Sequence, residues 1–363
     1  MRVRLGDVCD RGTSNLKQSD ITDTSGEYPV YGASGLIGTV SFYHQKLPYV
    51  AVVKDGAGIG RTTLHPAESS VIGTMQYLLP KANILPEYLY YVVKHMHLEK
   101  YYTGATIPHI YFKDYKSEEF NLEPLEKQHI IVDMLEKIES VIEARQNELK
   151  RLDDLIKSRF VELFGDPIMN PKGWEVVTIG DITTEVRYGT SKPAVEGGKY
   201  PYLRMNNLTI DGHLDLTELK YIDIPDDEIE KCVVRKGDIL FNRTNSIELV
   251  GKTAVFDFPD DMVIAGYIIR VRLNTKMLPE VLSQYMNLEA IKDILRSMAK
   301  GAVNQANINA QELQSIRVYV PDIELQKQFV EMKEQVDKSK VVVQKSLDET
   351  RLLFDSLMQK YFG

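Results

Sequence analysis

The sequence predicts an α/β (α+β) protein of two similar domains, each followed by a long helix. Three observations support this fold. The chain contains an ordered internal repeat, the residue pattern of each copy changes from strand-like to helical at the same place, and each copy ends in an apolar heptad pattern. The two helices are expected to pair as an antiparallel coiled coil, which gives the chain an internal pseudo-two-fold axis. At 363 residues the chain also exceeds what one hydrophobic core usually supports.

Short motifs return in the same order in the two halves of the chain. The matched segments are 5–8 with 179–182, 12–14 with 189–191, 28–29 with 200–201, 59–62 with 250–253, 85–87 with 278–280, 104–105 with 301–302, 125–128 with 325–328, and 164–165 with 362–363. Each match is weak by itself, but the shared order indicates a duplication.

Each copy begins with a region rich in glycine and in β-branched or aromatic residues. Residues 49–53, 239–241 and 267–271 are predicted to be short strands. Residues 86–100 and 279–298 each start with proline and are predicted to be helices within the same domains. After Pro124 and Pro321 the pattern becomes helical and stays helical to the end of each copy.

A heptad seam runs along each of these last segments. Lys340 and Thr350 interrupt it in the second copy, and Arg145 and Arg159 are polar interruptions in the first. The seam positions are Ile131, Leu135, Ile138, Ile142, Leu149, Leu152, Ile156 and Leu163, and, shifted by 198 residues, Val336, Lys340, Val343, Leu347, Thr350, Phe354, Leu357 and Tyr361. So narrow a seam requires a partner helix.

Equal length and shared register favour pairing of the two helices with each other; the alternative is that each packs on its own domain. Each helix would be roughly 55–60 Å long. An antiparallel pair would act as a spacer with one domain at either end. The predicted boundaries are 1–122 and 169–320 for the two domains, and 123–168 and 321–363 for the helices.

Composition limits the class of protein. The net charge of −8 argues against general binding of polyanions, but it does not exclude DNA binding through local basic clusters. The first residues lack the apolar core of a secretory signal, and no apolar run reaches membrane-spanning length. Cys9 and Cys232 suggest neither a disulfide framework nor a zinc site, so a cytoplasmic location is expected.

Several segments resemble catalytic motifs only in part. Residues 56–62 suggest a phosphate-binding loop, but the spacing is one residue short and Arg61 replaces lysine. Asp322, Glu331 and Lys333 imitate a nuclease pattern, although the last two fall on the predicted long helix. His95 and His97 point to different sides of a helix. No signature of an amino-methyltransferase occurs, so the sequence predicts no catalytic residue and no metal site.

Residues 124–131, Pro-Leu-Glu-Lys-Gln-His-Ile-Ile, lead into a long helix that ends in Leu-Phe-Gly. This segment resembles the central conserved region of type I restriction–modification specificity subunits. Residues 31–38, 54–61, 235–244 and 250–253 are similar to stretches that recur in the target recognition domains of that family. At the second helix entry, residues 320–326 depart from that family's pattern, because they lack the usual double proline.

The resemblance implies that residues 1–122 and 169–320 are target recognition domains, each reading one half of a split site in double-stranded DNA. It also implies that the long helices hold two modification (methyltransferase) subunits, which restriction subunits can join. S-adenosylmethionine, and ATP with Mg²⁺, would then belong to those partner subunits, and this chain would be non-catalytic. The spacer would hold the two recognition domains roughly one turn of the DNA duplex apart, at about 34–36 Å per turn.

Basic, amide and aromatic side chains gather in the glycine-rich turns and are the candidate DNA contacts. In the first domain they are Tyr31, Lys54, Arg61, Thr62, Thr63 and Lys113. In the second domain they are Arg187, Tyr188, Lys192, Tyr202, Arg204, Asn206, Asn207, Arg243, Thr244, Asn245, Lys252, Arg272, Asn304 and Gln305. Any one of them taken alone could be an ordinary solvated loop residue.

Two other functions stay open at this level. The chain could be a structural adaptor whose repeated domains bind proteins, or a self-sufficient metal-dependent nuclease using Glu331. Steep weakening of binding by salt would favour a DNA reader over an adaptor. Cleavage of DNA by the chain alone with magnesium would favour a nuclease.

Overall fold

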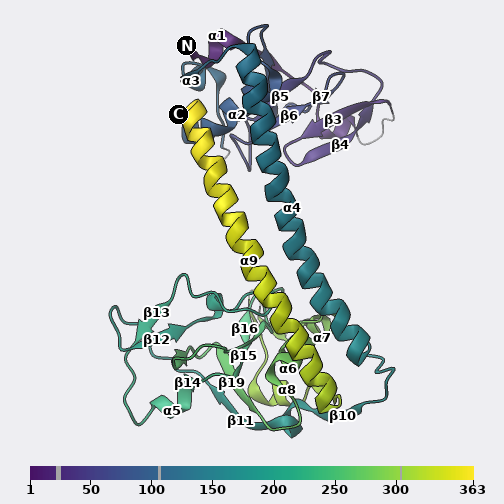
Figure 1. Ribbon diagram of the computed structural model, residues 1–363, viewed down its shortest axis with the longest axis vertical. Coiled ribbons are helices and arrows are strands. Elements are labelled where there is room, and N and C mark those ends of the chain that lie inside the picture. Colours follow the sequence, from purple (N-terminus) through teal and green to yellow (C-terminus); the bar gives the residue numbers. More distant parts are fainter. Residues whose placement is uncertain (22–25, 105–107, 303–304) are drawn as a thin grey trace. The chain divides into compact units, whose positions relative to one another are not determined.

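A computed structural model describes residues 1–21, 26–104, 108–302 and 305–363 (Figure 1). It divides into two compact units. The first unit contains Met1–Asn147 and Val343–Gly363, and the second contains Glu148–Val342. Each long helix therefore contributes one part to each unit.

The first unit is built on antiparallel strands. Its main sheet has the order β2-β8-β5-β6, with β2 Cys9–Thr13, β8 Met75–Pro80, β5 Tyr49–Val53 and β6 Thr62–His65. A second sheet, β4-β3-β7, consists of Gly35–Val40, Tyr28–Gly32 and Ser70–Val71, and β3 runs parallel to β7. The pair β1-β9 joins Arg2–Arg4 to Glu119–Asn121.

The helices of the first unit are mostly short. They are α1 Leu5–Val8, η1 Gln18–Asp20, α2 Pro86–His95, η2 Leu98–Tyr101 and α3 Phe112–Tyr115. The strand predicted at 49–53 is confirmed as β5. The helix predicted over 86–100 is interrupted, because His97 adopts a left-handed conformation with φ of 51°.

The second unit has the same types of sheet. Its main sheet, β11-β19-β15-β17, comprises Thr183–Tyr188, Ile268–Leu273, Ile239–Asn242 and Thr253–Val255. The sheet β13-β12-β18-β14 comprises Lys220–Ile222, Tyr200–Leu203, Met262–Ile264 and Val233–Val234, and β12 runs parallel to β18. The pair β10-β22 joins Glu175–Thr178 to Arg317–Val320.

A third small sheet in this unit, β16-β21-β20, comprises Thr244–Asn245, Gln305–Asn307 and Lys300–Ala302. The helices are η3 Ile179–Ile182, η4 Met205–Asn207, α5 Ile229–Cys232, α6 Pro279–Met286, α7 Glu289–Met298 and α8 Ala310–Gln314. The predicted single helix over 279–298 is two helices, because Asn287 ends α6 and its amide donates to the carbonyls of Ser283 and Thr253.

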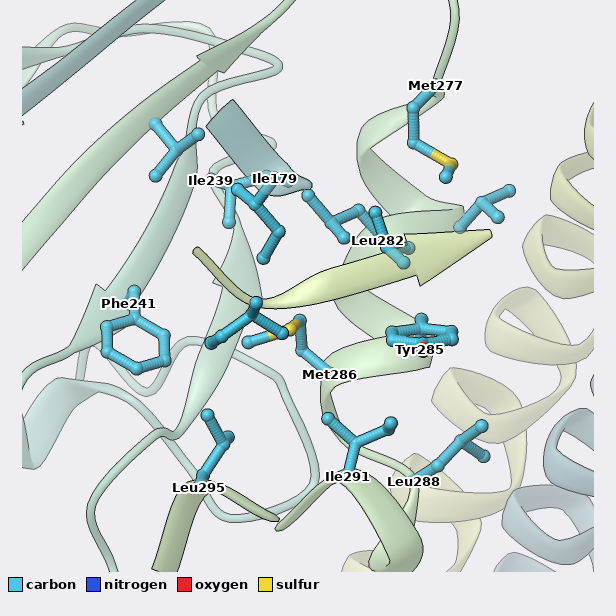
Figure 2. Close-up of a cluster of buried hydrophobic side chains, with 14 of the residues drawn as sticks. Ile179, Ile239, Phe241, Met277, Leu282, Tyr285, Met286, Leu288, Ile291 and Leu295 are labelled. Atoms are coloured by element: carbon cyan, nitrogen blue, oxygen red, sulfur yellow. The ribbon is translucent and has the colours of Figure 1, made fainter. Parts of the chain in front are cut away.

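The core of the second unit lies between the main sheet, α6, α7 and the long helices. Figure 2 shows part of this cluster, with Leu282, Tyr285 and Met286 of α6 among side chains that include Ile239 and Phe241 of β15. The first unit buries the corresponding face of its sheet against α2, with Tyr88, Leu89 and Val92 in the core. Both cores extend onto the long helices.

The two predicted long helices are confirmed as α4, Leu125–Phe164, and α9, Ile323–Phe362. Within the first unit, Ile131 and Leu135 of α4 belong to the same buried cluster as Met358 and Phe362 of α9. Within the second unit, Phe160 and Phe164 of α4 contact Phe329 of α9, with ring centroids 5.3 and 5.6 Å from it. No helix in the described part of the chain is long and apolar enough to cross a membrane.

The seam positions predicted along α4 and α9 are all buried or half-buried. Lys340, which interrupts the seam in the sequence, is compensated by an ion pair with Asp153 of α4 within the second unit. The Lys340 side chain is only 16% exposed. A lysine is tolerated there because a carboxylate of the neighbouring helix neutralises it.

A buried glutamine attaches the beginning of each long helix to its own domain. Gln128 is fully buried, and its Oε1 accepts the N–H of Leu85 at 2.9 Å, while Nε2 donates to the carbonyls of Asn83 and Glu123. Gln326 repeats the arrangement with the N–H of Leu278 and the carbonyls of Lys276 and Pro321. These contacts explain the repeat of 85–87 in 278–280. They make Gln326 the counterpart of Gln128, so the predicted match of 125–128 with 325–328, which aligns Gln128 with the exposed Gln328, is wrong by two residues.

Replacing Gln128 with methionine should lower the free energy of unfolding by about 2–4 kcal/mol, because one N–H and two carbonyls lose their buried partner. Gln326→Met should have a similar cost. Urea unfolding of the full chain measures both. The matched control is Gln146→Met at an exposed position of α4; equal effects at positions 128 and 146 would contradict the assigned role.

Candidate nucleic-acid interface

In the second unit the candidate surface centres on Arg243, which directly follows the central strand β15. Its backbone is held on both sides: its N–H donates to Tyr267 O, and its carbonyl accepts the N–H of Ile308 at 2.9 Å. Its guanidinium lies 5.0 Å above the ring of Tyr188. The Tyr188 hydroxyl accepts the N–H of Ala310 at 2.8 Å. The ring and the cation are therefore fixed relative to each other.

Amide side chains surround this pair. Asn245 lies on β16, which pairs with β21, the strand that carries the exposed Gln305. The Asn245 amide donates to Asn242 Oδ1 at 2.9 Å. Asn304, also expected to contact DNA, lies outside the described residues. The fold thus brings Tyr188, Arg243, Asn245 and Gln305 from three separate segments into one region.

In the first unit the corresponding region contains Lys54, which follows the central strand β5. Lys54 is 3.6 Å from the carboxylate of Asp55, which also pairs with His109. The His109 ring lies 4.0 Å from that of Tyr111, and the Lys113 ammonium lies 5.1 Å above the Tyr111 ring. Two predicted lysines, 54 and 113, are therefore joined by a row of polar and aromatic side chains.

The two regions share a backbone arrangement. Ile110 N–H donates to the Lys54 carbonyl at 3.0 Å, as Ile308 N–H does to the Arg243 carbonyl at 2.9 Å. Asp55 and His109 are bridge partners in one unit. Thr244 and Asn307 are β partners in the other. The position after the central strand is thus basic in both units, within the same frame.

The glycine-rich turn is structural in both units. Gly60 and Gly251 have φ of 81° and 84°, and each turn closes with a hydrogen bond back to the end of the central strand. Arg61 donates to the carbonyl of Ala33 at 2.9 Å. Because the turn at 56–62 joins two antiparallel strands, it lacks the strand-to-helix geometry of a phosphate-binding loop.

Five side chains expected to contact DNA are instead used inside the second unit, and we remove them from the candidate set. Lys252 is buried and donates to the carbonyls of Met205 and Leu208. Arg272 pairs with Glu185 and Asp238. The others, Tyr202, Asn207 and Thr244, are buried and hydrogen bonded to Lys192 O, Asp215 O and Asn307 Oδ1.

Several further candidates have local partners but stay accessible. Arg187 pairs with Glu185 at 3.0 Å, and Lys192 pairs with Glu228 at 2.7 Å. Arg204 makes a long hydrogen bond of 3.4 Å to the Glu218 carbonyl, and Asn206 beside it is exposed. Rearrangement of these exposed pairs costs little, because surface ion pairs contribute little stability.

Three candidates of the first domain have surroundings that do not suit contact with DNA: Tyr31, Thr62 and Thr63. Tyr31 packs on the buried His65 with ring centroids 4.4 Å apart. Thr62 and Thr63 line a groove of about 330 Å³ that also contains Glu87, Glu136 and Glu139. Burial and the neighbouring carboxylates raise the pKa of Glu136. Several carboxylates along one groove repel phosphates.

A larger groove of about 780 Å³ in the second unit also fails as an anion or metal site. Glu280, Glu334 and Asp337 line it together with lysines. The described residues contain no group of three or more His, Cys, Asp or Glu side chains that could hold a metal ion. Cys9 and Cys232 are free and buried, and burial raises the pKa of Cys9 to about 12.

Three side chains in the candidate surfaces are absent from the predicted set: His109, Tyr111 and Tyr267. Tyr111 and Tyr267 are 48% and 50% exposed, which is unusual for large aromatic side chains. Their sequence signal is weak, because Tyr267 falls at the start of a predicted strand, although the structure places it in a turn beside Gly266, and Tyr111 lies outside the glycine-rich turns. The local match of His109-Ile110 to Asn307-Ile308 becomes visible only when the hydrogen bonds are compared.

If Lys252 is structural, Lys252→Met should lower the free energy of unfolding by about 2–4 kcal/mol, because two buried carbonyls lose their donor. Denaturant unfolding of the full chain provides the measurement. Lys236→Met is the matched control, since that side chain is 72% exposed and pairs with Asp257 at the surface. A stable Lys252→Met chain would return Lys252 to the candidate contacts.

Comparison with known proteins identifies relatives along most of the chain. A family model described as the type I restriction modification DNA specificity domain matches residues 1–152 and 171–349. The putative type I restriction enzyme MjaX specificity subunit of Methanocaldococcus jannaschii is 31% identical over 196 residues, which are 53% of this chain and 46% of that protein. The EcoKI specificity subunit of Escherichia coli K12 is 24% identical over 280 residues, 71% of this chain and 60% of that protein.

This chain thus covers about half to three fifths of the length of those two relatives. Among solved structures, the S subunit of the type I restriction–modification system from M. genitalium superposes with a TM-score of 0.63 at 16% identity, over 100% of this chain and 96% of that one. That likeness supports the fold. On the family match, the chain belongs to the family of type I restriction modification DNA specificity domains.

Proposed function

We propose that this chain reads a bipartite sequence in double-stranded DNA, with one half-site read by residues 1–122 and the other by residues 169–320. The observation that carries the proposal is the repeated surface: Lys54 and Arg243 follow the central strands in the same backbone frame and lie among polar and aromatic groups. A basic residue beside groups able to pair with bases suits DNA recognition.

The proposed contact set keeps the accessible candidates and adds the three side chains that the fold brings to the same surfaces. In the first domain it comprises Lys54, Arg61, His109, Tyr111 and Lys113. In the second domain it comprises Arg187, Tyr188, Lys192, Arg204, Asn206, Arg243, Asn245, Tyr267 and Gln305, with Asn304 retained from the sequence.

Residues 123–168 and 321–363 are proposed to form an antiparallel coiled coil that relates the two halves by a pseudo-two-fold axis. Support comes from contacts within each unit. The beginning of α4 packs with the end of α9 in the first unit, and the end of α4 packs with the beginning of α9 in the second. Such a pair would fix the distance between the two half-sites.

The long helices are also proposed to dock two modification subunits, which would supply S-adenosylmethionine and the methyl-transfer chemistry. Restriction subunits with ATP and Mg²⁺ could join them. A solved relative is described in terms of complex assembly of the type I restriction–modification system. On this chain the support is a set of exposed apolar side chains on the helices: Ile130, Val141, Leu155, Val341, Val342, Leu352 and Leu353.

The test is to co-express the full chain with its modification subunit and to map methylated positions in DNA. Two short sequences at a constant spacing are expected. Binding by the purified complex should weaken steeply as salt rises, because phosphate contacts release counterions. Replacing residues 1–122 with those of a homologue should change one half-site only.

Salt-insensitive binding with no methylated consensus would favour the adaptor alternative instead. Cleavage of DNA by the purified chain alone with magnesium, lost on Glu331→Ala, would favour the nuclease alternative. Glu331 is exposed on α9.

Leu352→Glu should abolish or strongly reduce co-purification of the modification subunit, because it places a charge in the proposed docking face. Leu352 is 70% exposed, so the unfolding midpoint of the free chain should change little. Pull-down with a tagged modification subunit measures the effect. Gln344→Glu, another exposed position of α9, is the matched control; equal recovery of the partner with both variants would place docking elsewhere.

A further inference from the structure

The arginines of residues 169–320 are almost all engaged within the protein. Six of them donate to carboxylates or carbonyls: Arg187, Arg204, Arg235, Arg270, Arg272 and Arg296. Arg243 and Arg317 make no side-chain hydrogen bond or ion pair with any described residue. Arg317 lies exposed on β22, whereas Arg243 lies in the candidate surface.

Arg243 is restrained although it is unpaired. The side chain is half-buried, its Nε is shielded from solvent without a partner, and its guanidinium lies over the Tyr188 ring. The ring is itself anchored through its hydroxyl to the N–H of Ala310. Stacking on an aromatic face restricts the direction of the guanidinium fork. A cation that only neutralises phosphates does not need this restraint.

The neighbours of Arg243 also suit recognition of bases. Asn245 and Gln305 carry amides, which can pair with adenine, and an arginine fork matches the O6 and N7 acceptors of guanine in the major groove. Two carboxylates of the same unit, Glu185 and Asp238, pair with Arg270 and Arg272. The guanidinium of Arg243 itself makes no ion pair with a described carboxylate, and its Nε has no hydrogen-bond partner.

We propose that Arg243, held on Tyr188, reads a guanine in the half-site of the second domain, and that Lys54 is the base-reading residue at the matched position of the first domain. This inference rests on the proposed function, since it assigns roles within that reading surface. Lys54 differs in chemistry, because it shares its surroundings with Asp55 and His109. The two matched positions would thus read different bases on the same framework.

The experiment uses the full chain in complex with its modification subunit and a library of duplexes randomised over both half-sites. Arg243→Ala should reduce discrimination at one base pair of the second half-site by roughly 10- to 100-fold and leave the first unchanged. Arg243→Lys should lose most of that discrimination while the salt dependence stays the same, because the charge remains and the fork is lost. Lys54→Ala should change one position of the first half-site only.

Arg317→Ala is the matched control, an unpaired arginine of the same unit outside the surface, and it should leave both half-sites unchanged. Tyr188→Ala should weaken the same base preference as Arg243→Ala, whereas Tyr188→Phe should weaken it less, because the supporting ring remains. Uniform weakening on all sequences by Arg243→Ala, with a salt slope reduced by about 1, would identify a phosphate contact and overturn the proposal. An unchanged base preference in the Arg243→Lys complex would also overturn the proposal for Arg243. If the unmutated complex shows no sequence preference at all, the proposed function itself is refuted.

Discussion

The buried glutamine at the start of each long helix is the constraint on which the rest of the structure depends. Gln128 and Gln326 are fully buried, and each holds one N–H and two carbonyls that would otherwise lack a partner. An unmet buried polar group is costly, so each helix has one favourable orientation on its domain. A surface that reads DNA at a fixed place along a spacer requires this rigidity. Apolar packing alone would allow the helix to rotate more easily.

The pairing of charges distinguishes the cations that hold the fold together from those on the proposed DNA-reading surface. Most cations of the second domain are engaged internally: Lys252 donates to two carbonyls, and Arg272 pairs with Glu185 and Asp238. Carboxylates line the grooves beside α2 and α6. A chain of net charge −8 can therefore bind DNA only where uncommitted cations remain. Arg243 is such a cation, and Lys54 is held only by the adjacent Asp55. In the proposed reading surface, their shared backbone arrangement would allow the bases that are read to change without changing the fold.

The sequence predicts the elements better than it predicts the site. The repeat, the strand at 49–53 and both long helices are visible in it, because each depends on local periodicity or on motifs in order. The break at Asn287 depends on a contact with Thr253, which no periodicity reveals. Lys252 and Arg243 look equivalent in sequence, since both are cations in polar turns. Only tertiary contacts show that one is buried on carbonyls while the other is unpaired over Tyr188.

Lys340, which interrupts the seam, bears on the register of the proposed coiled coil. An apolar residue there would be more stabilising, since a lysine that is only 16% exposed loses much of its hydration. Its partner Asp153 exists at one register of the antiparallel pair. A slip of one heptad would shift the helices by about 10 Å and separate the two charges. If the chain reads two half-sites as proposed, their distance would depend on that register, and a polar pair that costs stability would be retained for the spacing that it specifies.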